Sequence, residues 1–241
     1  MPEAILFQGV DFAFENLTVL EKVNLKIKPG EFVGIVGPNG GGKTTFLKLA
    51  CGLLKPTRGK ILVFGKKPAD FYPKISYVPQ ISKIERDFPI SVLELVLLGT
   101  VTKNSFFYQY SPSVKTRALG LLETLGLGGY LDQPFGNLSG GQAQKALIAK
   151  ALISNPEILI LDEPMANLDL KGEKIIFQLI KTELQNKTVL MVSHDLNVVI
   201  NEVQSLLFVE KTISRKLPHE ICEHFAVGLY HQPLIKDNKK T

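Results

Sequence analysis

The stretch "GPNGGGKTT" limits what this chain can become more than any other segment. Its first eight residues fit the pattern G-x-x-x-x-G-K-[ST], and they stand between a short apolar run, "EFVGIVG", and a helix-like segment, "TTFLKLACGLL". In a strand, loop and helix of this kind, backbone N–H groups surround phosphate groups at the positive end of the helix. We expect Lys43 to reach the β- and γ-phosphates and the Thr44 hydroxyl to ligate Mg²⁺. The predicted phosphate site comprises Gly37, Pro38, Asn39, Gly40, Gly41, Gly42, Lys43, Thr44 and Thr45.

The pattern of apolar residues predicts an α/β protein. Three short apolar runs, "EFVGIVG", "EILILDEP" and "KTVLMVSHD", are typical of parallel strands buried on both faces. The earlier segments "AILFQGVDFAF" and "VNLKIKPG" alternate, which indicates half-exposed antiparallel strands. Residues 82–153 are mainly helical in pattern, with a capping box from Ser91 to Glu94 before "VLELVLLG".

Composition and charge argue against a membrane-spanning, secreted or nucleic-acid-binding protein. A chain of 241 residues, 45% of them hydrophobic, can bury a large core. No apolar run reaches the roughly 18–20 residues of a membrane helix, and the start lacks the features of a signal peptide, so we expect a cytosolic location. The two cysteines suit a reducing compartment. The net charge of +5 comes from scattered residues, so we expect no nucleic-acid partner.

Polar side chains follow the predicted parallel strands at the edge where ligands gather in such sheets. We expect Asp162 to hold Mg²⁺ through water, and Glu163, on the opposite side of the pleat, to polarise an attacking water. The alternative is that this pair caps a following helix. His194 in "VSHD" is placed to contact the γ-phosphate, and Gln80 in "ISYVPQ" to reach Mg²⁺ and the water.

A second segment, "NLSGGQAQKAL", also has the profile of an anion site. A serine and two glycines stand where a helix is predicted to begin, and glycines allow the backbone to approach an anion closely. The sequence therefore contains two candidate phosphate sites about a hundred residues apart.

With the phosphate loop, Gln80, "LSGGQ", "LDEP", "NLD" and "SHD" in this order, the chain resembles the ATP-binding subunits of ABC transporters from about residue 4 to 230. The resemblance implies a P-loop NTPase core with a mainly parallel sheet, an N-terminal antiparallel β-subdomain and an inserted α-helical subdomain at about 82–153. It implies a single domain over 1–241 whose tail, about 231–241, is flexible.

The resemblance also assigns binding residues. Phe14 matches the aromatic residue that stacks under the adenine of ATP. In similar proteins two ATPase subunits pack head to tail, and the signature of one covers the γ-phosphate bound to the other. This arrangement implies a homodimer and explains the second phosphate site. The residues that match the signature are Leu138, Ser139, Gly140, Gly141 and Gln142, and those that match the D-loop are Asn167, Leu168 and Asp169.

Several residues differ from the commonest form of the family. Lys145 replaces an arginine after the signature, and Gly41 replaces a serine or alanine. Met165 and Asn167 are also less usual. None of these differences removes a reacting group.

Within the family, "ISYVPQISKIERDFPISVLELVLLGT" and "EHFAVGLYH" are most similar to ATPases of zinc, manganese and iron importers. The resemblance implies integral membrane permease subunits as partners, an extracytoplasmic metal-binding protein as an indirect partner, and a location on the cytoplasmic face of the membrane. The alternatives are the ATPase of a siderophore or haem importer or of an exporter, and a soluble ABC factor acting on ribosomes or nucleic acid.

A cluster in "LPHEICEHF" suggests a metal sensor at first sight. On a helix, His219 and Cys222 share a face, but His224 points elsewhere, so the three cannot converge on one ion. We therefore expect an ordinary amphipathic helix end there.

Overall fold

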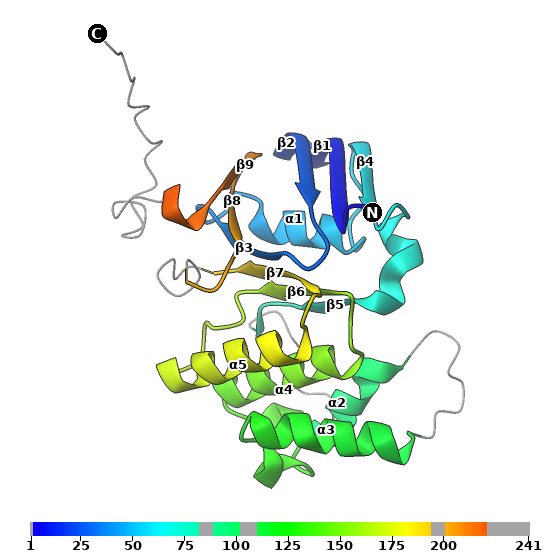
Figure 1. The fold of residues 1–241 in the computed structure, drawn as a ribbon, viewed down its shortest axis with the longest axis vertical. Coiled ribbons are helices and arrows are strands. Elements are labelled where there is room, and N and C mark those ends of the chain that lie inside the picture. Colours follow the sequence, from blue (N-terminus) through cyan, green and yellow to red (C-terminus); the bar gives the residue numbers. More distant parts are fainter. Residues whose placement is uncertain (1, 82–88, 102–109, 194–200, 221–241) are drawn as a thin grey trace.

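The computed structural model describes residues 2–81, 89–101, 110–193 and 201–220, and their strands form two sheets (Figure 1). The smaller sheet is antiparallel, in the order β2-β1-β4, and the larger has the order β5-β6-β7-β3-β8-β9. All neighbours in the larger sheet are parallel except β8 and β9. The strands are β1 (Ile5–Phe14), β2 (Leu17–Ile27), β3 (Phe32–Val36), β4 (Arg58–Val63), β5 (Ile75–Val78), β6 (Ile158–Asp162), β7 (Thr188–Val192), β8 (Ser205–Glu210) and β9 (Thr212–Lys216).

Helices cover both faces of the larger sheet (Figure 1). The α-helices are α1 (Lys43–Ala50), α2 (Val92–Leu97), α3 (Pro112–Thr124), α4 (Gly140–Ile153) and α5 (Leu170–Glu183). Short 3₁₀ helices are η1 (Pro68–Lys74), η3 (Leu98–Thr100), η4 (Gly128–Tyr130), η5 (Phe135–Asn137) and η6 (Pro218–Glu220). Helix α1 lies between the two sheets, whereas α2 to α5 lie on the other face of the larger sheet. Among the helices in these ranges, none is both long and apolar enough to cross a membrane.

The parallel strands are buried because alternate side chains enter two different cores. In β6, Ile158 and Ile160 pack with α1 and the smaller sheet, whereas Leu159 and Leu161 pack with the helices of the other face. Strands β3, β6 and β7 are buried along their whole length. The α/β fold, the parallel strands and the antiparallel N-terminal strands predicted from the sequence are confirmed, whereas β4, β8 and β9 were not predicted.

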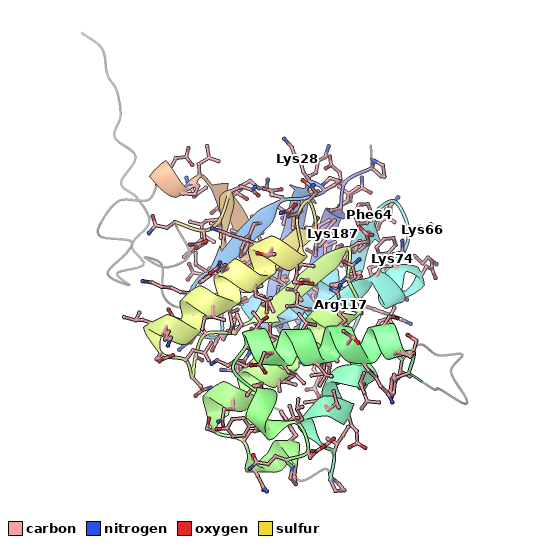
Figure 2. All side chains as sticks on the ribbon, turned by 60° about the horizontal axis from the view of Figure 1, so that its bottom comes forward. Lys28, Phe64, Lys66, Lys74, Arg117 and Lys187 are labelled. Atoms are coloured by element: carbon pink, nitrogen blue, oxygen red, sulfur yellow. The ribbon has the colours of Figure 1, made fainter. Side chains whose placement is uncertain are left out.

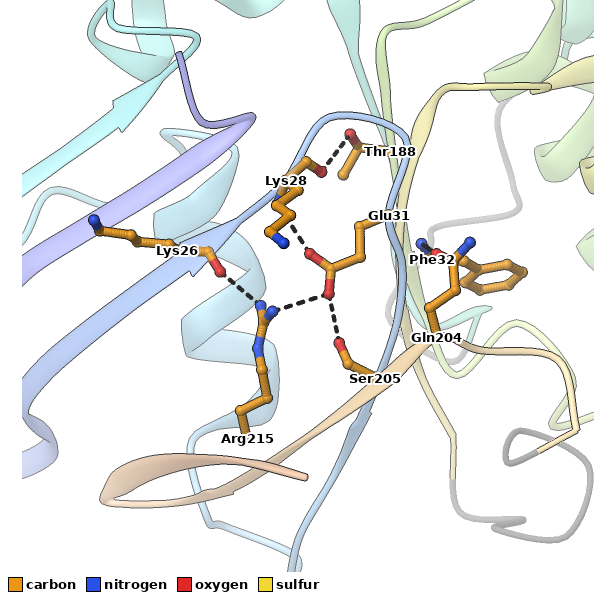
Figure 3. A network of polar contacts seen from close by, with 8 residues as sticks. All are labelled: Lys26, Lys28, Glu31, Phe32, Thr188, Gln204, Ser205 and Arg215. Carbon is orange, nitrogen blue, oxygen red and sulfur yellow. Dashed lines mark hydrogen bonds and ion pairs between the residues drawn. The ribbon is translucent and has the colours of Figure 1, made fainter. Parts of the chain in front are cut away.

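Polar contacts join the two sheets where β3 begins (Figure 3). The Glu31 carboxylate accepts hydrogen bonds from the Lys28 backbone N–H at 2.9 Å, the Ser205 hydroxyl at 2.7 Å and the Arg215 guanidinium at 3.0 Å. Arg215 also donates to the Lys26 carbonyl at 2.6 Å. These bonds hold the end of β2 and the start of β8 against β3, so the strand that leads into the phosphate loop is fixed at its base.

Besides the apolar packing among α2 to α5, Arg117 of α3, which Figure 2 labels, makes polar contacts with two other helices. Its guanidinium donates to the Glu183 carboxylate of α5 at 2.6 Å and to the Leu152 carbonyl near the end of α4 at 3.3 Å. One side chain therefore connects three helices on this face of the sheet.

Candidate active site

The phosphate loop connects β3 to α1, and the start of α1 has no side-chain cap. Gly42 occupies the N-cap position with a φ of 99°, and it has no side chain to accept from the first backbone N–H groups. The other α-helices in the described ranges are capped by Ser91, Ser111, Ser139 and Asp169. Uncapped N–H groups at a helix start form an anion site, so this loop fits the phosphates of a nucleotide.

Lys43 is held inside the loop. Its ammonium group donates hydrogen bonds to the carbonyls of Gly37 at 2.9 Å and Pro38 at 3.0 Å, and the residue is only 7% exposed. Burial lowers the pKa of Lys43 below its ordinary value, while the nearby charges of Glu163 and Asp162 act in the opposite direction. A negatively charged phosphate would further favour the charged form.

Strand β8 passes so close to the phosphate loop that two of the loop positions have no room for a side chain. A Cβ atom on Gly37 would lie 2.2 Å from the Val209 carbonyl oxygen of β8, and one on Gly41 would lie 2.6 Å from the same atom. Backbone cannot move aside as a flexible side chain can. The absence of a serine or alanine at Gly41 therefore follows from the close approach of β8.

Asp162 ends β6 beside the start of α1. Its Oδ2 atom accepts hydrogen bonds from the Thr44 hydroxyl at 2.9 Å and from the Tyr77 hydroxyl at 3.2 Å. Asp162 is 1% exposed, and a buried carboxylate needs such partners or a cation. Mg²⁺ prefers oxygen ligands, so the pairing of Thr44 and Asp162 beside the loop fits this ion.

Tyr77 was not among the site residues predicted from the sequence. Burial and the charge of Asp162 both raise the pKa of Tyr77, so its hydroxyl is protonated at neutral pH. The only signal was an aromatic residue in the strand that precedes Gln80, and this reads equally well as a core residue.

Glu163 lies just beyond β6, and the expectation that the pleat separates it from Asp162 is wrong. The strand ends at Asp162, and Glu163 has a φ of 53°, in the left-handed region. The turn of the backbone therefore directs the two carboxylates differently. The Glu163 carboxylate accepts a hydrogen bond from the Gln80 amide at 2.8 Å, so these two predicted residues are in contact.

Phe14 is at the end of β1 and is 50% exposed. Its ring and that of Phe12 are nearly perpendicular, with centroids 4.8 Å apart. Its stacking on adenine stays a prediction.

The signature segment begins α4, on the other side of the sheet from α1 (Figure 1). The exposed Ser139 accepts from the Gln142 backbone N–H at 3.3 Å, and the Gln142 side chain accepts from the Ser139 N–H at 2.9 Å. Residues of α4 pack in the opposite core from those of α1. The two candidate phosphate sites of one chain are therefore presented by elements on opposite faces of the sheet.

The D-loop packs directly on the signature. A Cβ atom on Gly140 would lie 3.4 Å from the Asn167 side chain, and one on Gly141 would lie 2.7 Å from the Asn167 carbonyl oxygen. Leu168 is half-buried nearby, and Asp169 caps α5 by accepting from the Gly172 N–H at 2.9 Å. Leu138 is 4% exposed and belongs to the core.

Some predicted residues cannot be placed. His194, Cys222, Glu223 and His224 lie outside the described residues, as do residues 231–241.

A phosphate-binding loop between a strand and a helix, a buried carboxylate at the end of a neighbouring strand and a second carboxylate beside it are together typical of P-loop NTPases. The profile of the ABC transporter family matches residues 20–166. The chain therefore belongs to the ABC transporter family, as one of its ATP-hydrolysing subunits, and the resemblance predicted from the motifs is confirmed.

Relatives and solved structures agree with this assignment. The chain is 36% identical over 214 residues to the manganese transport system ATP-binding protein MntB of Listeria monocytogenes, covering 88% of this chain and 89% of that protein. It is 36% identical over 218 residues to the zinc uptake system ATP-binding protein ZurA of Listeria innocua, covering 88% and 85%. A dimeric ATP-binding cassette, MJ0796 in a post-hydrolysis state bound to ADP and Pi, superposes with a TM-score of 0.78 at 30% identity, covering 89% of this chain and 98% of that one.

Proposed function

We propose that the chain powers a membrane transporter that imports a divalent metal cation, zinc, manganese or iron, by hydrolysing Mg-ATP. The observation that carries the catalytic part is the pairing of Thr44 with Asp162 and of Gln80 with Glu163 beside the uncapped start of α1. The cation class is supported by the relatives that are named for manganese transport and zinc uptake.

ATP would bind along the loop and the end of β1. The loop backbone surrounds the phosphates, Lys43 donates to the β- and γ-phosphates, and Phe14 stacks on the adenine. The uncapped N–H groups of α1 and the buried ammonium group support the phosphate assignment.

Thr44, Asp162 and Gln80 would hold Mg²⁺, with Asp162 acting through water. The ion would supply charge neutralisation for the phosphate oxygens. The contact between the Thr44 hydroxyl and the Asp162 carboxylate supports this set of ligands.

Glu163 polarises the water that attacks the γ-phosphate in line. Gln80 donates to its carboxylate and keeps the accepting oxygen oriented. His194 contacts the γ-phosphate and orients the same water. Positioning and charge neutralisation account for most of the catalysis.

The working unit is a head-to-tail homodimer. The signature of one subunit, with its exposed Ser139 at a helix start, covers the γ-phosphate held by the other. The placement of α1 and α4 on opposite faces of the sheet and the dimeric cassette relative support this arrangement. ATP then bridges the subunits, and hydrolysis removes the bridge.

The dimer acts on permease subunits at the cytoplasmic face of the membrane. Closure of the two ATPase subunits pulls on the permease, which receives the cation from an extracytoplasmic metal-binding protein. Purification of the chain from membranes with its permease and receptor, followed by metal analysis of the receptor, tests the transported ion. A receptor loaded with haem or a siderophore would contradict the cation class.

The substitution Glu163→Gln tests the mechanism. It keeps the shape of the side chain but removes the base, so we expect ATP binding to persist and hydrolysis to fall by about 100-fold or more. A dimer should accumulate with ATP and be visible by size-exclusion chromatography. Glu157→Gln is the matched control, because Glu157 lies just before the other end of β6 and pairs with Lys187.

The control should hydrolyse ATP at the wild-type rate and form no trapped dimer. Hydrolysis by Glu163→Gln at the wild-type rate would show that another group activates the water.

A further inference from the structure

We propose that Tyr77 is a positioning residue for the Mg²⁺ site, whose hydroxyl fixes the orientation of the Asp162 carboxylate. This inference rests on the proposed function, because it assigns a further residue to the metal site of ATP hydrolysis. It concerns a side chain that the family motifs in this sequence do not include.

The register of two parallel strands brings the hydroxyl to the carboxylate. Tyr77 of β5 pairs with Ile160 of β6, and Asp162 lies two residues further along the same strand. Side chains two residues apart share a face, and the rise of about 3.3 Å per residue places Asp162 roughly 7 Å ahead of Ile160. A tyrosine that leans along its strand spans this distance, and its hydroxyl reaches Oδ2 at 3.2 Å.

Both side-chain donors reach the same oxygen of Asp162. Thr44 approaches Oδ2 from α1 and Tyr77 approaches it from β5. An ionised carboxylate only accepts hydrogen bonds, so both hydroxyls donate. The terminal torsion of an aspartate is soft, and two donors from two elements restrict its rotation.

This restriction leaves Oδ1, the other oxygen of Asp162, to accept from the water through which Asp162 would hold the metal. No side chain in the described ranges donates a hydrogen bond to Oδ1 of Asp162. Outer partners that orient a metal-binding carboxylate raise the affinity of the site, because the ligand does not have to be ordered when the ion binds. Tyr77 would thus act through Asp162, without touching the ion.

The hydrogen bond between Tyr77 and Asp162 is partly buried, so its loss should affect the carboxylate. Asp162 is 1% exposed and Tyr77 is half-buried, so water cannot freely replace the hydroxyl if it is removed. A phenylalanine would fill the core equally well. The alternative is a purely structural role, in which the ring packs in the core and the hydroxyl donates to Asp162 without affecting how the carboxylate binds the metal.

The test measures nucleotide binding, not hydrolysis. A fluorescent ATP analogue, mant-ATP, is titrated into wild type and Tyr77→Phe, with Mg²⁺ and with EDTA. The dissociation constant in EDTA divided by the dissociation constant with Mg²⁺ gives the factor by which Mg²⁺ strengthens binding. We expect Tyr77→Phe to reduce this ratio by about 10-fold and to change the affinity in EDTA less than about twofold.

Tyr130→Phe is the matched control. Tyr130 is also half-buried, but it lies in η4 and packs against the core formed with α2 to α5. This variant should keep the wild-type ratio. In an Asp162→Asn background, Tyr77→Phe should no longer change the ratio, because the carboxylate has gone. Thermal unfolding without nucleotide measures how much the Tyr77 hydroxyl contributes to stability, so a loss of Mg²⁺ binding can be told apart from a loss of folded protein.

The outcomes are distinct. If Mg²⁺ does not strengthen binding to wild type, the proposed metal site is wrong. If it does, and Tyr77→Phe keeps the wild-type ratio or loses affinity equally with and without Mg²⁺, only the role of Tyr77 is overturned. An undiminished effect of Tyr77→Phe in the Asp162→Asn background would also overturn it.

Discussion

The contact between the signature and the D-loop predicts different effects for two adjacent glycines. A Cβ atom on Gly141 would lie 2.7 Å from the Asn167 carbonyl oxygen and 3.4 Å from the Leu168 side chain. An ordinary carbon to oxygen contact is about 3.3 Å or more, so the added methyl group would overlap by about 0.6 Å with a backbone atom. For Gly140 the nearest atoms are 3.4 Å away, on the Asn167 side chain, which is an ordinary contact.

The magnitude follows from this difference. Gly to Ala in a helix gains about 0.5–1 kcal/mol, and this gain applies to both positions. Overpacking costs about 1–3 kcal/mol and applies to Gly141→Ala. We therefore expect Gly141→Ala to be less stable than Gly140→Ala by about 1–3 kcal/mol, which lowers the Tm by about 3–9 °C in a domain of this size.

Differential scanning calorimetry of both variants without nucleotide measures this difference. Their ATPase rates are measured in parallel, and both should fall if the signature contacts the γ-phosphate of the partner. A Tm for Gly141→Ala equal to or above that of Gly140→Ala would show that the D-loop moves aside without loss of stability, and that the close approach of Asn167 does not require glycine at position 141.

Two further comparisons use matched positions. Ser139→Ala and Ser91→Ala each remove an N-cap and should each lower the free energy of unfolding by about 1 kcal/mol in urea titrations. Only Ser139→Ala should also reduce ATP hydrolysis, and an equal loss of activity in both would contradict the role of the signature. Arg215→Met leaves the Glu31 carboxylate, which is only 11% exposed, without its cation and should lower the free energy of unfolding by about 1–3 kcal/mol. Lys22→Met removes an exposed ion pair and should change it by less than about 0.5 kcal/mol, so equal effects would count against the Glu31 contacts as a stabilising network.

Much of the fold could be predicted from short segments. The capping box at Ser91 and the helix start at Ser139 formed as expected, because a cap depends on residues within one turn. The apolar runs became the buried parallel strands β3, β6 and β7, since a strand covered on both faces needs apolar residues throughout.

The candidate site was partly predictable for the same reason. Carboxyl ends of parallel strands meet at one edge, so the proximity of Gln80 to Glu163 followed from their places after apolar runs. The direction of Glu163 did not, because its left-handed backbone breaks the alternation of the strand. The roles of these residues stay predictions.

The amino-acid pattern was enough to predict the phosphate loop, helices α1 to α4, the buried strands β3, β6 and β7, and the family to which the chain belongs, but not helix α5 or strand β8. The neighbourhood of β8 and β3, with the Val209 carbonyl against Gly37 and Gly41, became known only from the three-dimensional fold. The same is true of the contact between the Tyr77 hydroxyl and Asp162. The difference lies in how far apart in the sequence the interacting residues are. Caps and strand burial are set by neighbours in the chain, whereas strand order and register depend on packing between segments far apart in the sequence, which no short pattern encodes.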